Sequence, residues 1–319
     1  MATASFILTP VPPFRLDDTA WALRRRPQNQ IDRWDGSQYT RVLAIHDRAV
    51  KTCVVQTGGD ANPQLHITLH SKEALAAIQQ AEIAVLVATM LGVTIDLAAF
   101  YELANGDAVL SALVPRFMGL KPPRFPTIFE ALLNAFACQQ VTLEVGILLL
   151  NRFTEAYGLP YHDGQTIAHA FPRPADVADT SLDAIRKLGF SFQKARAISE
   201  LANGLMQHPD MLAPLAALPN DEAIQQLLVL RGVGRWTAEY VLLRGLGRIA
   251  MFPGDDVGAQ RNLQRLFHLD EKPTYDTIKK LTASWQPYAG LVYFHLLLDK
   301  LQQKGCLSAS SVASIDAKV

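Results

Sequence analysis

The sequence predicts a mainly α protein in which a smaller N-terminal α/β domain with an antiparallel sheet precedes a larger, all-helical domain. Two observations carry this prediction. Before about residue 100, short runs rich in β-branched residues are typical of strands, and one of them alternates with a period of two. After Gly92 the apolar residues follow a helical period that prolines divide into segments. We therefore expect domains over 1–100 and 101–310, followed by a tail over 311–319.

The N-terminal region contains three predicted strands and two predicted helices. The strands are expected over 41–46, 51–56 and 65–70. The helices are expected over 17–25 and 72–91. A turn-forming run of Gly, Asp, Asn and Pro separates the second strand from the third. Such a run favours an antiparallel hairpin with a long loop.

Two helix starts in the helical region carry capping signals. Thr127-Ile-Phe-Glu130 has the form of a capping box and opens an apolar helix. Asn220, which precedes two acidic residues, is expected to cap the helix that leads to Leu230.

Composition excludes several classes of protein. With 319 residues and 49% apolar content, the chain is long and apolar enough for two folded cores. The longest uncharged apolar run, Ile83–Ile95, is shorter than the roughly 20 residues of a membrane-spanning helix. The first residues lack the basic and apolar regions of a secretory signal, so we expect a cytoplasmic protein. Three separated cysteines exclude a disulfide framework and most zinc or iron–sulfur sites.

Charge is balanced overall and uneven locally. Thirty basic and thirty acidic side chains give a net charge of zero, which argues mildly against a strongly electrostatic nucleic-acid binder. Basic side chains nevertheless outnumber acidic ones over 116–124, 186–196 and 231–248. Such runs are usually solvated faces, so only their position in the fold can connect them with a partner.

The most informative stretch begins with Gly232-Val-Gly234, a Gly-x-Gly turn between two apolar helices. This is the signature of a helix-hairpin-helix. Glycines let the backbone come close to a phosphate, and the following helix directs its unpaired N–H groups and positive dipole end at that phosphate. Such a contact does not depend on nucleotide sequence. The bland alternative is an ordinary tight turn.

An acid pair, Asp255-Asp256, follows in a Pro-Gly turn that leads into another helix. The sequence Gly-Val-Gly-Arg-Trp-Thr-Ala, followed at this spacing by Pro-x-Asp-Asp, resembles the helix-hairpin-helix DNA glycosylases, most closely the bacterial 3-methyladenine DNA glycosylase II type. Stretches over 137–142, 188–196 and 285–289 agree with that family. The resemblance spans about residues 110–300, and the family carries a small α/β domain before this region.

The resemblance implies a catalytic carboxylate at Asp256, the second acid of the pair. Breaking an N-glycosidic bond places positive charge on the sugar, and a fixed carboxylate stabilises that charge and orients the attacking water. Asp255 is then expected to serve only as a helix cap. Relatives that also cleave the strand carry a lysine where this chain has Trp236. The resemblance therefore implies a hydrolase without lyase activity.

The resemblance also places a base pocket on the helix that follows the hairpin. Trp236 and Tyr240 lie one helical turn apart on one face, and their rings suit a flipped, cationic methylated purine. An aromatic stripe in a helical core is the alternative. A further pocket tryptophan of the family corresponds here to Leu297, which implies a less aromatic pocket. The wedge that fills the gap left by the flipped nucleotide corresponds to Gln140 or its neighbour Val141.

Contacts with double-stranded DNA are expected on both sides of the hairpin. The residues are Gln139, Gln140, Lys194, Arg196, Gly232, Gly234 and Arg235. The resemblance further implies a monovalent cation, Na⁺ or K⁺, held by the backbone carbonyls of Leu228, Leu230 and Val233. We expect no organic cofactor. We also expect the protein to be a monomer.

These features together predict a base-excision DNA glycosylase that removes alkylated purines of the 3-methyladenine type by hydrolysis. Three alternatives stay open. A non-catalytic hairpin protein would bind DNA less well with a carboxylate at Asp256 near the phosphates. A glycosylase for oxidised or mismatched bases would need the missing lysine or, in the iron–sulfur type, four clustered cysteines. An ordinary helical interaction domain would leave the spacing of hairpin and acid pair to coincidence.

Overall fold

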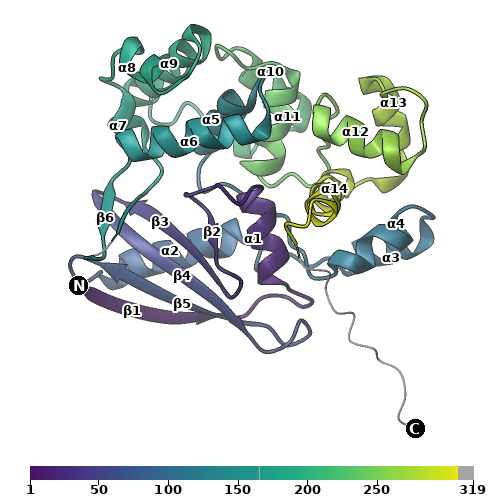
Figure 1. Cartoon of the computed structure of the whole chain (residues 1–319), viewed down its shortest axis with the longest axis horizontal. Helices are drawn as coiled ribbons and strands as arrows, with labels where there is room; N and C mark the ends of the chain where they lie inside the picture. Colours follow the sequence, from purple (N-terminus) through teal and green to yellow (C-terminus); the bar gives the residue numbers. More distant parts are fainter. Residues whose placement is uncertain (165, 308–319) are drawn as a thin grey trace.

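The structure, a computed structural model, describes residues 1–164 and 166–307, so the predicted tail over 311–319 lies outside the described residues. An antiparallel sheet formed by the N-terminal part of the chain lies beside a larger group of helices (Figure 1). The predicted fold class, mainly α with an N-terminal antiparallel sheet, is confirmed. The domain boundaries stay predictions.

Five antiparallel strands form the sheet in the order β1-β5-β4-β3-β2. Their bounds are Ala2–Leu8 (β1), Arg33–Trp34 (β2), Gln38–Ile45 (β3), Arg48–Thr57 (β4) and Gln64–Ser71 (β5). The three predicted strands form the centre, and β4 and β5 pair as the expected hairpin. The edge strands were not predicted. β2 is only two residues long, too short for a periodic signal.

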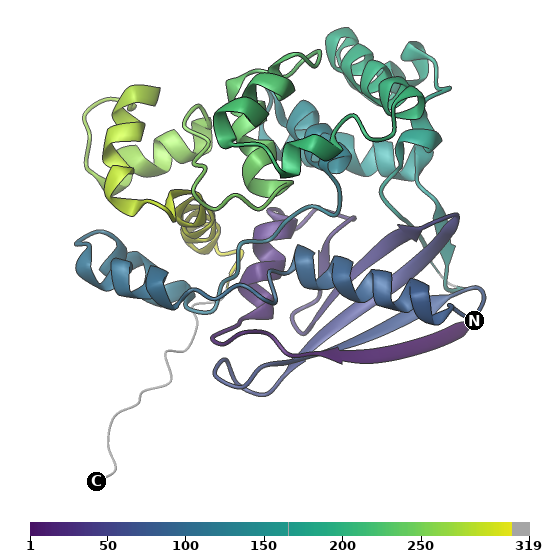
Figure 2. The same ribbon diagram turned by 180° about the vertical axis from the view of Figure 1, so that it is seen from behind.

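Two helices, α1 (Leu16–Arg24) and α2 (Ala77–Met90), pack with the sheet. Figure 2 shows α2 lying across one face, where its Ile83 and Val87 share a core with the central strands. This helix begins later than predicted, because Gln79 Oε1 accepts a hydrogen bond from the Ala76 N–H at 3.0 Å and fixes the start there.

The larger part of the molecule is helical, with one exception. Its helices are α3 (Ala98–Gly106), α4 (Leu110–Leu113), α5 (Ile128–Cys138), α6 (Leu143–Tyr157), α7 (Pro174–Val177), α8 (Leu182–Lys187), α9 (Phe192–Gln207), α10 (Asn220–Leu228), α11 (Arg235–Arg244), α12 (Val257–Leu266), α13 (Tyr275–Leu281) and α14 (Ala289–Gln303). The short hairpin of β6 (Pro160–His162) and β7 (Ile167–His169) corrects the expectation of an all-helical region. It forms because Tyr161 is buried against Val42 of the sheet, a contact that the local sequence does not reveal.

The two predicted helix caps have different outcomes. Thr127 caps α5, since its hydroxyl accepts from the Glu130 N–H at 3.0 Å. Asn220 is not a cap: it is the first residue of α10, and its side-chain oxygen accepts from Arg248 Nη1 at 2.7 Å. Arg248, from beyond α11, therefore uses the side chain that would have capped the helix.

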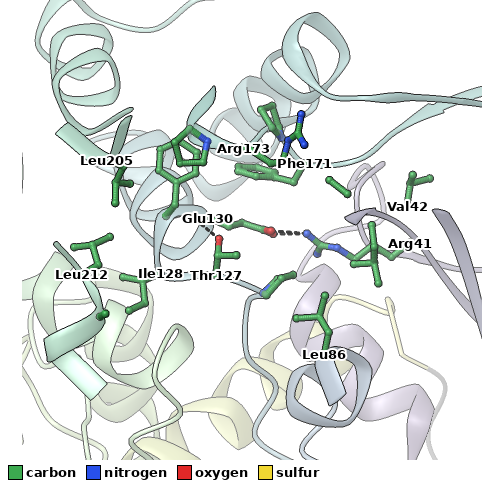
Figure 3. Close-up of a pocket in the computed structure, with 17 residues that line it drawn as sticks. Arg41, Val42, Leu86, Thr127, Ile128, Glu130, Phe171, Arg173, Leu205 and Leu212 are labelled. Atoms are coloured by element: carbon green, nitrogen blue, oxygen red, sulfur yellow. Dashed lines mark hydrogen bonds and ion pairs between the residues drawn. The ribbon is translucent and has the colours of Figure 1, made fainter. Parts of the chain in front are cut away.

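A buried ion-pair network connects the sheet to the helices. Arg41 of β3 donates to Asp32 at 2.7 Å and to Glu130 of α5 at 2.6 Å, and Figure 3 shows it reaching across to Glu130. Because the Glu130 carboxylate is paired with Arg41, only one of the two hydrogen bonds of the predicted capping box forms, the one from the Glu130 N–H to the Thr127 hydroxyl. An apolar cavity of about 320 Å³ lies beside this pair, between β3 and the start of α5.

Candidate active site

The predicted hairpin is present between α10 and α11, which are joined by residues 229–234. Gly232 has a φ of +78°, a backbone conformation that favours glycine, and a Cβ there would lie 3.1 Å from the Ala197 Cβ. Gly234 precedes α11 directly and has an ordinary φ of −107°. A Cβ at Gly234 would meet nothing within 4 Å, so the surface over the start of α11 is open to a close approach.

Two predicted DNA contacts, Gln139 and Lys194, have partners inside the protein. Gln139 Nε2 donates to the Gly232 carbonyl at 2.8 Å and to the Thr237 hydroxyl at 2.9 Å. Lys194 Nζ donates to the carbonyls of Ala137 at 3.1 Å and Gln139 at 2.7 Å. Burial lowers the pKa of Lys194. These bonds tie the end of α5 to the hairpin and to α9, so both side chains hold the binding surface together.

A cavity of about 1040 Å³ opens next to the hairpin. It is bounded by the end of α1, the α5–α6 loop, the start of α11, the Asp255–Asp256 turn with α12, and one face of α14. The predicted site residues that line it are Gln139, Gln140, Trp236, Tyr240, Asp256 and Leu297. The structure thus gathers residues from five separate segments at one place.

Asp256 is held at the edge of this cavity by three hydrogen bonds. Its Oδ1 accepts from the Ala259 N–H at 2.8 Å, so Asp256 is itself the N-cap of α12. Its Oδ2 accepts from the Trp236 indole and the Tyr293 hydroxyl, each at 3.2 Å. The carboxylate is therefore fixed in position, with one oxygen on the aromatic side of the cavity.

Asp255 does not cap the helix, which corrects the role expected for it. Its carboxylate accepts from Arg235 Nε at 2.7 Å, and the Arg235 guanidinium lies 3.6 Å from the centre of the Tyr275 ring. The two acids of the pair thus point to different partners, because only the second is in position to accept from the first turn of α12.

The turn that carries the acid pair is fastened to α11 by Glu239, a buried residue. Glu239 accepts from the Gly254 N–H at 3.1 Å and from the Tyr275 hydroxyl at 2.5 Å. A Cβ on Gly254 would lie 2.7 Å from the Tyr275 ring, so only glycine fits there. Burial raises the pKa of Glu239. The carboxylate of Asp256 is consequently placed by α11 as well as by its own helix.

Trp236 and Tyr240 do lie side by side, with ring centres 5.4 Å apart and planes inclined by 33°. Tyr240 is the more deeply buried, only 3% exposed, and its hydroxyl accepts from Arg25 Nη1 at 3.0 Å. Leu297 lies on α14 one turn after Tyr293, and both line the cavity. The pair is therefore both core and cavity wall, with Trp236 nearer the acid.

The expected wedge, Gln140, lies in the loop between α5 and α6. Its φ is +53°, unusual for a residue other than glycine, and its side chain is exposed. Val141 beside it is 40% exposed. Both line the mouth of the cavity, and the wedge assignment stays a prediction.

Basic residues around the mouth only partly match those predicted. Arg196 pairs with Glu200 at 2.7 Å, and Glu200 also pairs with Arg231 at 2.7 Å. Side chains that sequence reasoning missed line the cavity instead, and they are Arg26, Arg261, Arg265, Lys300 and Lys304. They lie on α12 and α14 or just after the ends of α1 and α14, which no local run of charge brings together.

Sequence reasoning also missed Arg25 and Tyr293. Tyr293 had a usable signal, because it lies one helical turn before Leu297 on the same face. Arg25 had none, since it follows α1 and reaches the cavity only through the tertiary fold.

The carbonyls predicted to hold a cation lie where α10 ends and the hairpin turns. Leu228 is the last residue of α10, and the Val233 N–H donates to the Leu230 carbonyl at 3.2 Å. Among the described residues, no cluster of three or more His, Cys, Asp or Glu side chains could hold a metal ion.

The hairpin and the acid-bearing cavity are the two features of this fold that point to a family. The family model of the HhH-GPD superfamily base excision DNA repair proteins matches residues 133–287, slightly less than half of the chain, so the chain is similar to this superfamily over its hairpin and acid pair.

Curated relatives include DNA-3-methyladenine glycosylases. DNA-3-methyladenine glycosylase 2 of Escherichia coli is 27% identical over 89% of this chain and 94% of that protein. DNA-3-methyladenine glycosylase of Bacillus subtilis is 29% identical over 63% of this chain and 66% of that protein. The chain spans slightly less than two thirds of the length of the two Bacillus subtilis relatives it matches.

Among solved structures, 3-methyladenine DNA-glycosylase from Archaeoglobus fulgidus superposes with a TM-score of 0.79 at 21% identity, covering 95% of this chain and all of that one. This similarity shows the fold. Within the described residues, no helix is both long and apolar enough to span a membrane.

Proposed function

We propose that this protein is a monofunctional DNA glycosylase that flips alkylated purines out of double-stranded DNA and releases them by hydrolysis. The observation that carries the proposal is Asp256, a carboxylate fixed by the Trp236 indole and the Tyr293 hydroxyl at a cavity beside the hairpin. Relatives named DNA-3-methyladenine glycosylase support the substrate class.

The chemistry follows from the positions of these groups. The hairpin N–H groups at Gly234 and beyond bind a phosphate near the lesion and hold the duplex. The base enters the cavity next to Trp236, and its sugar stays near the Asp256 carboxylate. When the glycosidic bond breaks, positive charge develops on the sugar and Asp256 stabilises it electrostatically. A water molecule then adds to the sugar carbon.

The test is release of free methylated purines from alkylated duplex DNA by wild-type protein, Asp256→Asn and Asp255→Asn. Asparagine at 256 can still cap α12 but carries no charge, so we expect release to fall about 100-fold or more. Asp255→Asn changes the same charge one residue away and should retain most activity. Equal loss in both variants would contradict the assignment of Asp256.

A bifunctional glycosylase and lyase is the second candidate, because Lys300 and Lys304 line the cavity although no lysine lies in the hairpin. A lysine amine could attack the sugar carbon and form a Schiff base. Borohydride added during the reaction would trap protein on DNA if this happens. We expect no trapping and no strand cleavage without alkali; trapping that disappears in Lys300→Ala or Lys304→Ala would establish the lyase.

The remaining expectations are part of the same proposal: a monomer, cytoplasmic, that needs no organic cofactor. A monovalent cation fits the carbonyls of Leu228, Leu230 and Val233, since the C-terminal end of α10 carries the negative end of the helix dipole. DNA affinity measured in NaCl or KCl should then exceed affinity in tetramethylammonium chloride at equal ionic strength. Equal affinities would remove the cation from the proposal.

A further inference from the structure

Two arginines that the mechanism above does not use lie at the buried end of the base cavity. Arg25 lines the cavity and is 4% exposed, and Arg244 of α11 is fully buried. Tyr240 lies between them: its hydroxyl accepts from Arg25 at 3.0 Å, and the Arg244 guanidinium lies 5.7 Å from its ring centre.

Among the described residues, no carboxylate forms a salt bridge with either arginine. Arg25 donates to Tyr240 and, at 2.5 Å, to the Asn134 side-chain oxygen, and Arg244 donates to the Ala22 carbonyl at 2.7 Å. Arg25 also donates to the Cys138 thiol at 3.9 Å, and both arginines contact an aromatic ring: the guanidinium of Arg25 lies 5.6 Å and that of Arg244 4.8 Å from the centre of the Phe125 ring.

The carboxylates buried nearby already form ion pairs with another arginine. Asp32 and Glu130 both pair with Arg41 at 2.6–2.7 Å. Three buried guanidinium groups therefore face two buried carboxylates, and the excess positive charge belongs to Arg25 and Arg244. Water screens it little at this depth.

Arg25 thus puts positive charge at the buried end of the cavity, whereas the basic residues that line it elsewhere, among them Arg261 and Lys300, are exposed or half-buried and are screened by water. Arg25 and Tyr240 form the buried end, while Asp256 is partly exposed near the mouth, where a sugar still attached to DNA must stay. A base bound between them lies in a field directed from the arginines toward the carboxylate. Tyr240 is also less able to attract a cationic base than its ring alone suggests, because Arg244 already lies against it.

Glycosidic bond cleavage moves charge along this field. The bond between C1′ and the base nitrogen breaks, both electrons stay on the base, and the sugar becomes positive. Water then forms the new C1′–O bond and loses a proton. A cationic alkylated base leaves as a neutral molecule and that proton goes to solvent, whereas a neutral base leaves as an anion and gains a proton.

We propose that Arg25, backed by Arg244, is a specificity-determining residue that lets this cavity release neutral purine lesions as well as cationic ones. This role of Arg25 rests on the proposed glycosylase function. The positive charge of Arg25 stabilises the anion formed from a neutral base. For a cationic base, the same charge weakens ground-state binding and favours departure of positive charge toward Asp256.

The experiment compares Arg25→Gln with wild type on duplexes containing either 7-methylguanine, which is cationic, or hypoxanthine, which is neutral. Arg48→Gln is the matched control, because Arg48 is an exposed arginine of the sheet that does not line the cavity. Single-turnover rates at several protein concentrations give the rate of the bound complex and the half-saturating concentration separately. Thermal unfolding shows whether each variant is folded.

For hypoxanthine, we expect Arg25→Gln to lower the bound-state rate at least about tenfold with little change in half-saturation, since one well-placed donor can contribute 10²–10³-fold. For 7-methylguanine, both the rate and the half-saturating concentration should fall, which leaves their ratio nearly unchanged. Arg25→Lys, which keeps the charge, should recover hypoxanthine release. If Arg25 had a purely structural role, Arg25→Gln would lower the release rates of both substrates equally and would not lower the half-saturating concentration for 7-methylguanine. That result would overturn the inference.

A measurement on wild-type protein covers the case in which neutral variants do not fold. Free xanthine, which ionises to an anion near neutral pH, should inhibit more strongly as its ionised fraction rises, relative to free adenine as the non-ionising control. Unchanged relative inhibition would contradict the inference. If the wild-type protein releases neither lesion, the proposed function itself fails. If the wild-type protein releases both lesions and a folded Arg25→Gln variant releases both equally well, only the role of Arg25 fails.

Discussion

Single side chains at the site are fixed by partners from elsewhere in the sequence. Trp236 does more than provide a flat ring, because its indole N–H donates to Asp256. Tyr293 makes the second such bond from α14, and burial together with the negative charge of Asp256 raises the pKa of Tyr293, which keeps its donor proton in place. The aromatic wall and the acid therefore act as one unit.

This predicts a specific defect in Trp236→Phe. An aromatic ring beside Tyr240 is retained, although it is smaller than the indole, and the hydrogen bond to the carboxylate is lost, which costs roughly 1.5–3 kcal/mol for a charged acceptor. We expect base release in single-turnover reactions to slow roughly 10- to 100-fold, while binding to undamaged duplex stays the same. A parallel loss of both would show that the ring, not the N–H, is what matters.

His295 of α14 is a buried residue whose charge affects stability. It lies between Phe100 and Phe117, its Nδ1 contacts the Leu291 carbonyl at 3.0 Å, and burial lowers its pKa to about 4. Above the ordinary pKa near 6.5, both the folded and unfolded states are neutral at this position. As the pH falls from there toward 4, only the unfolded state gains a proton, so the free energy of unfolding decreases.

We therefore expect His295→Leu to remove part of the acid sensitivity. At pH 5 the neutral, buried histidine lowers the free energy of unfolding by on the order of 2 kcal/mol. Between pH 7.5 and pH 5 the free energy of unfolding of the variant should therefore fall by about 2 kcal/mol less than that of the wild type. Denaturant unfolding at both pH values measures this difference. Asp18, whose pKa is raised to about 7 by burial, has the opposite sign but is common to both proteins. Equal losses would refute the assignment.

At the scale of elements, the hairpin separates two roles of glycine. Gly232 has the left-handed backbone that the turn needs, whereas Gly234 has an ordinary backbone and open space above it. Stability requires the first glycine, and access to the start of α11 requires the second.

The pair Gly232→Ala and Gly234→Ala tests this separation. Alanine at 232 should destabilise the protein by roughly 1–2 kcal/mol through the left-handed backbone. Alanine at 234 should leave thermal stability within about 0.5 kcal/mol but reduce duplex affinity about tenfold, because its methyl group stands where a phosphate approaches. Unfolding curves and fluorescence anisotropy with labelled duplex measure the two effects. Normal affinity in Gly234→Ala would place the phosphate elsewhere.

At the scale of the whole molecule, ion pairs tie the sheet to a helix that ends at the cavity. Arg41 on β3 joins Asp32, which precedes β2, to Glu130 on α5, and α5 ends at the cavity. Arg25 reaches the same cavity from the end of α1. The N-terminal region therefore contributes directly to the geometry of the cavity.

A double-mutant cycle on Arg41→Met and Glu130→Leu measures this connection. Arg41→Met alone should cost about 3–5 kcal/mol, since it leaves two buried carboxylates without their partner. The double variant should lose clearly less free energy of unfolding than the two single variants lose together, because charges in contact with each other are energetically coupled. Denaturant unfolding of all four proteins gives the coupling energy. Additive costs would mean that Arg41 and Glu130 do not stabilise each other.

The sequence by itself determined the elements and motifs whose signals are local. The three central strands, the mainly helical character after Gly92, the hairpin glycines and the spacing to the acid pair could all be predicted, because periodicity and turn chemistry act between residues close in the chain. Tertiary structure alone decided what faces the site. It made Asp256 rather than Asp255 the cap, turned Lys194 inward, and brought Arg25 to the cavity. Apart from the cap bond itself, which joins Asp256 to Ala259, these outcomes depend on contacts between residues about 20 to more than 200 positions apart, where burial and charge pairing choose the partner.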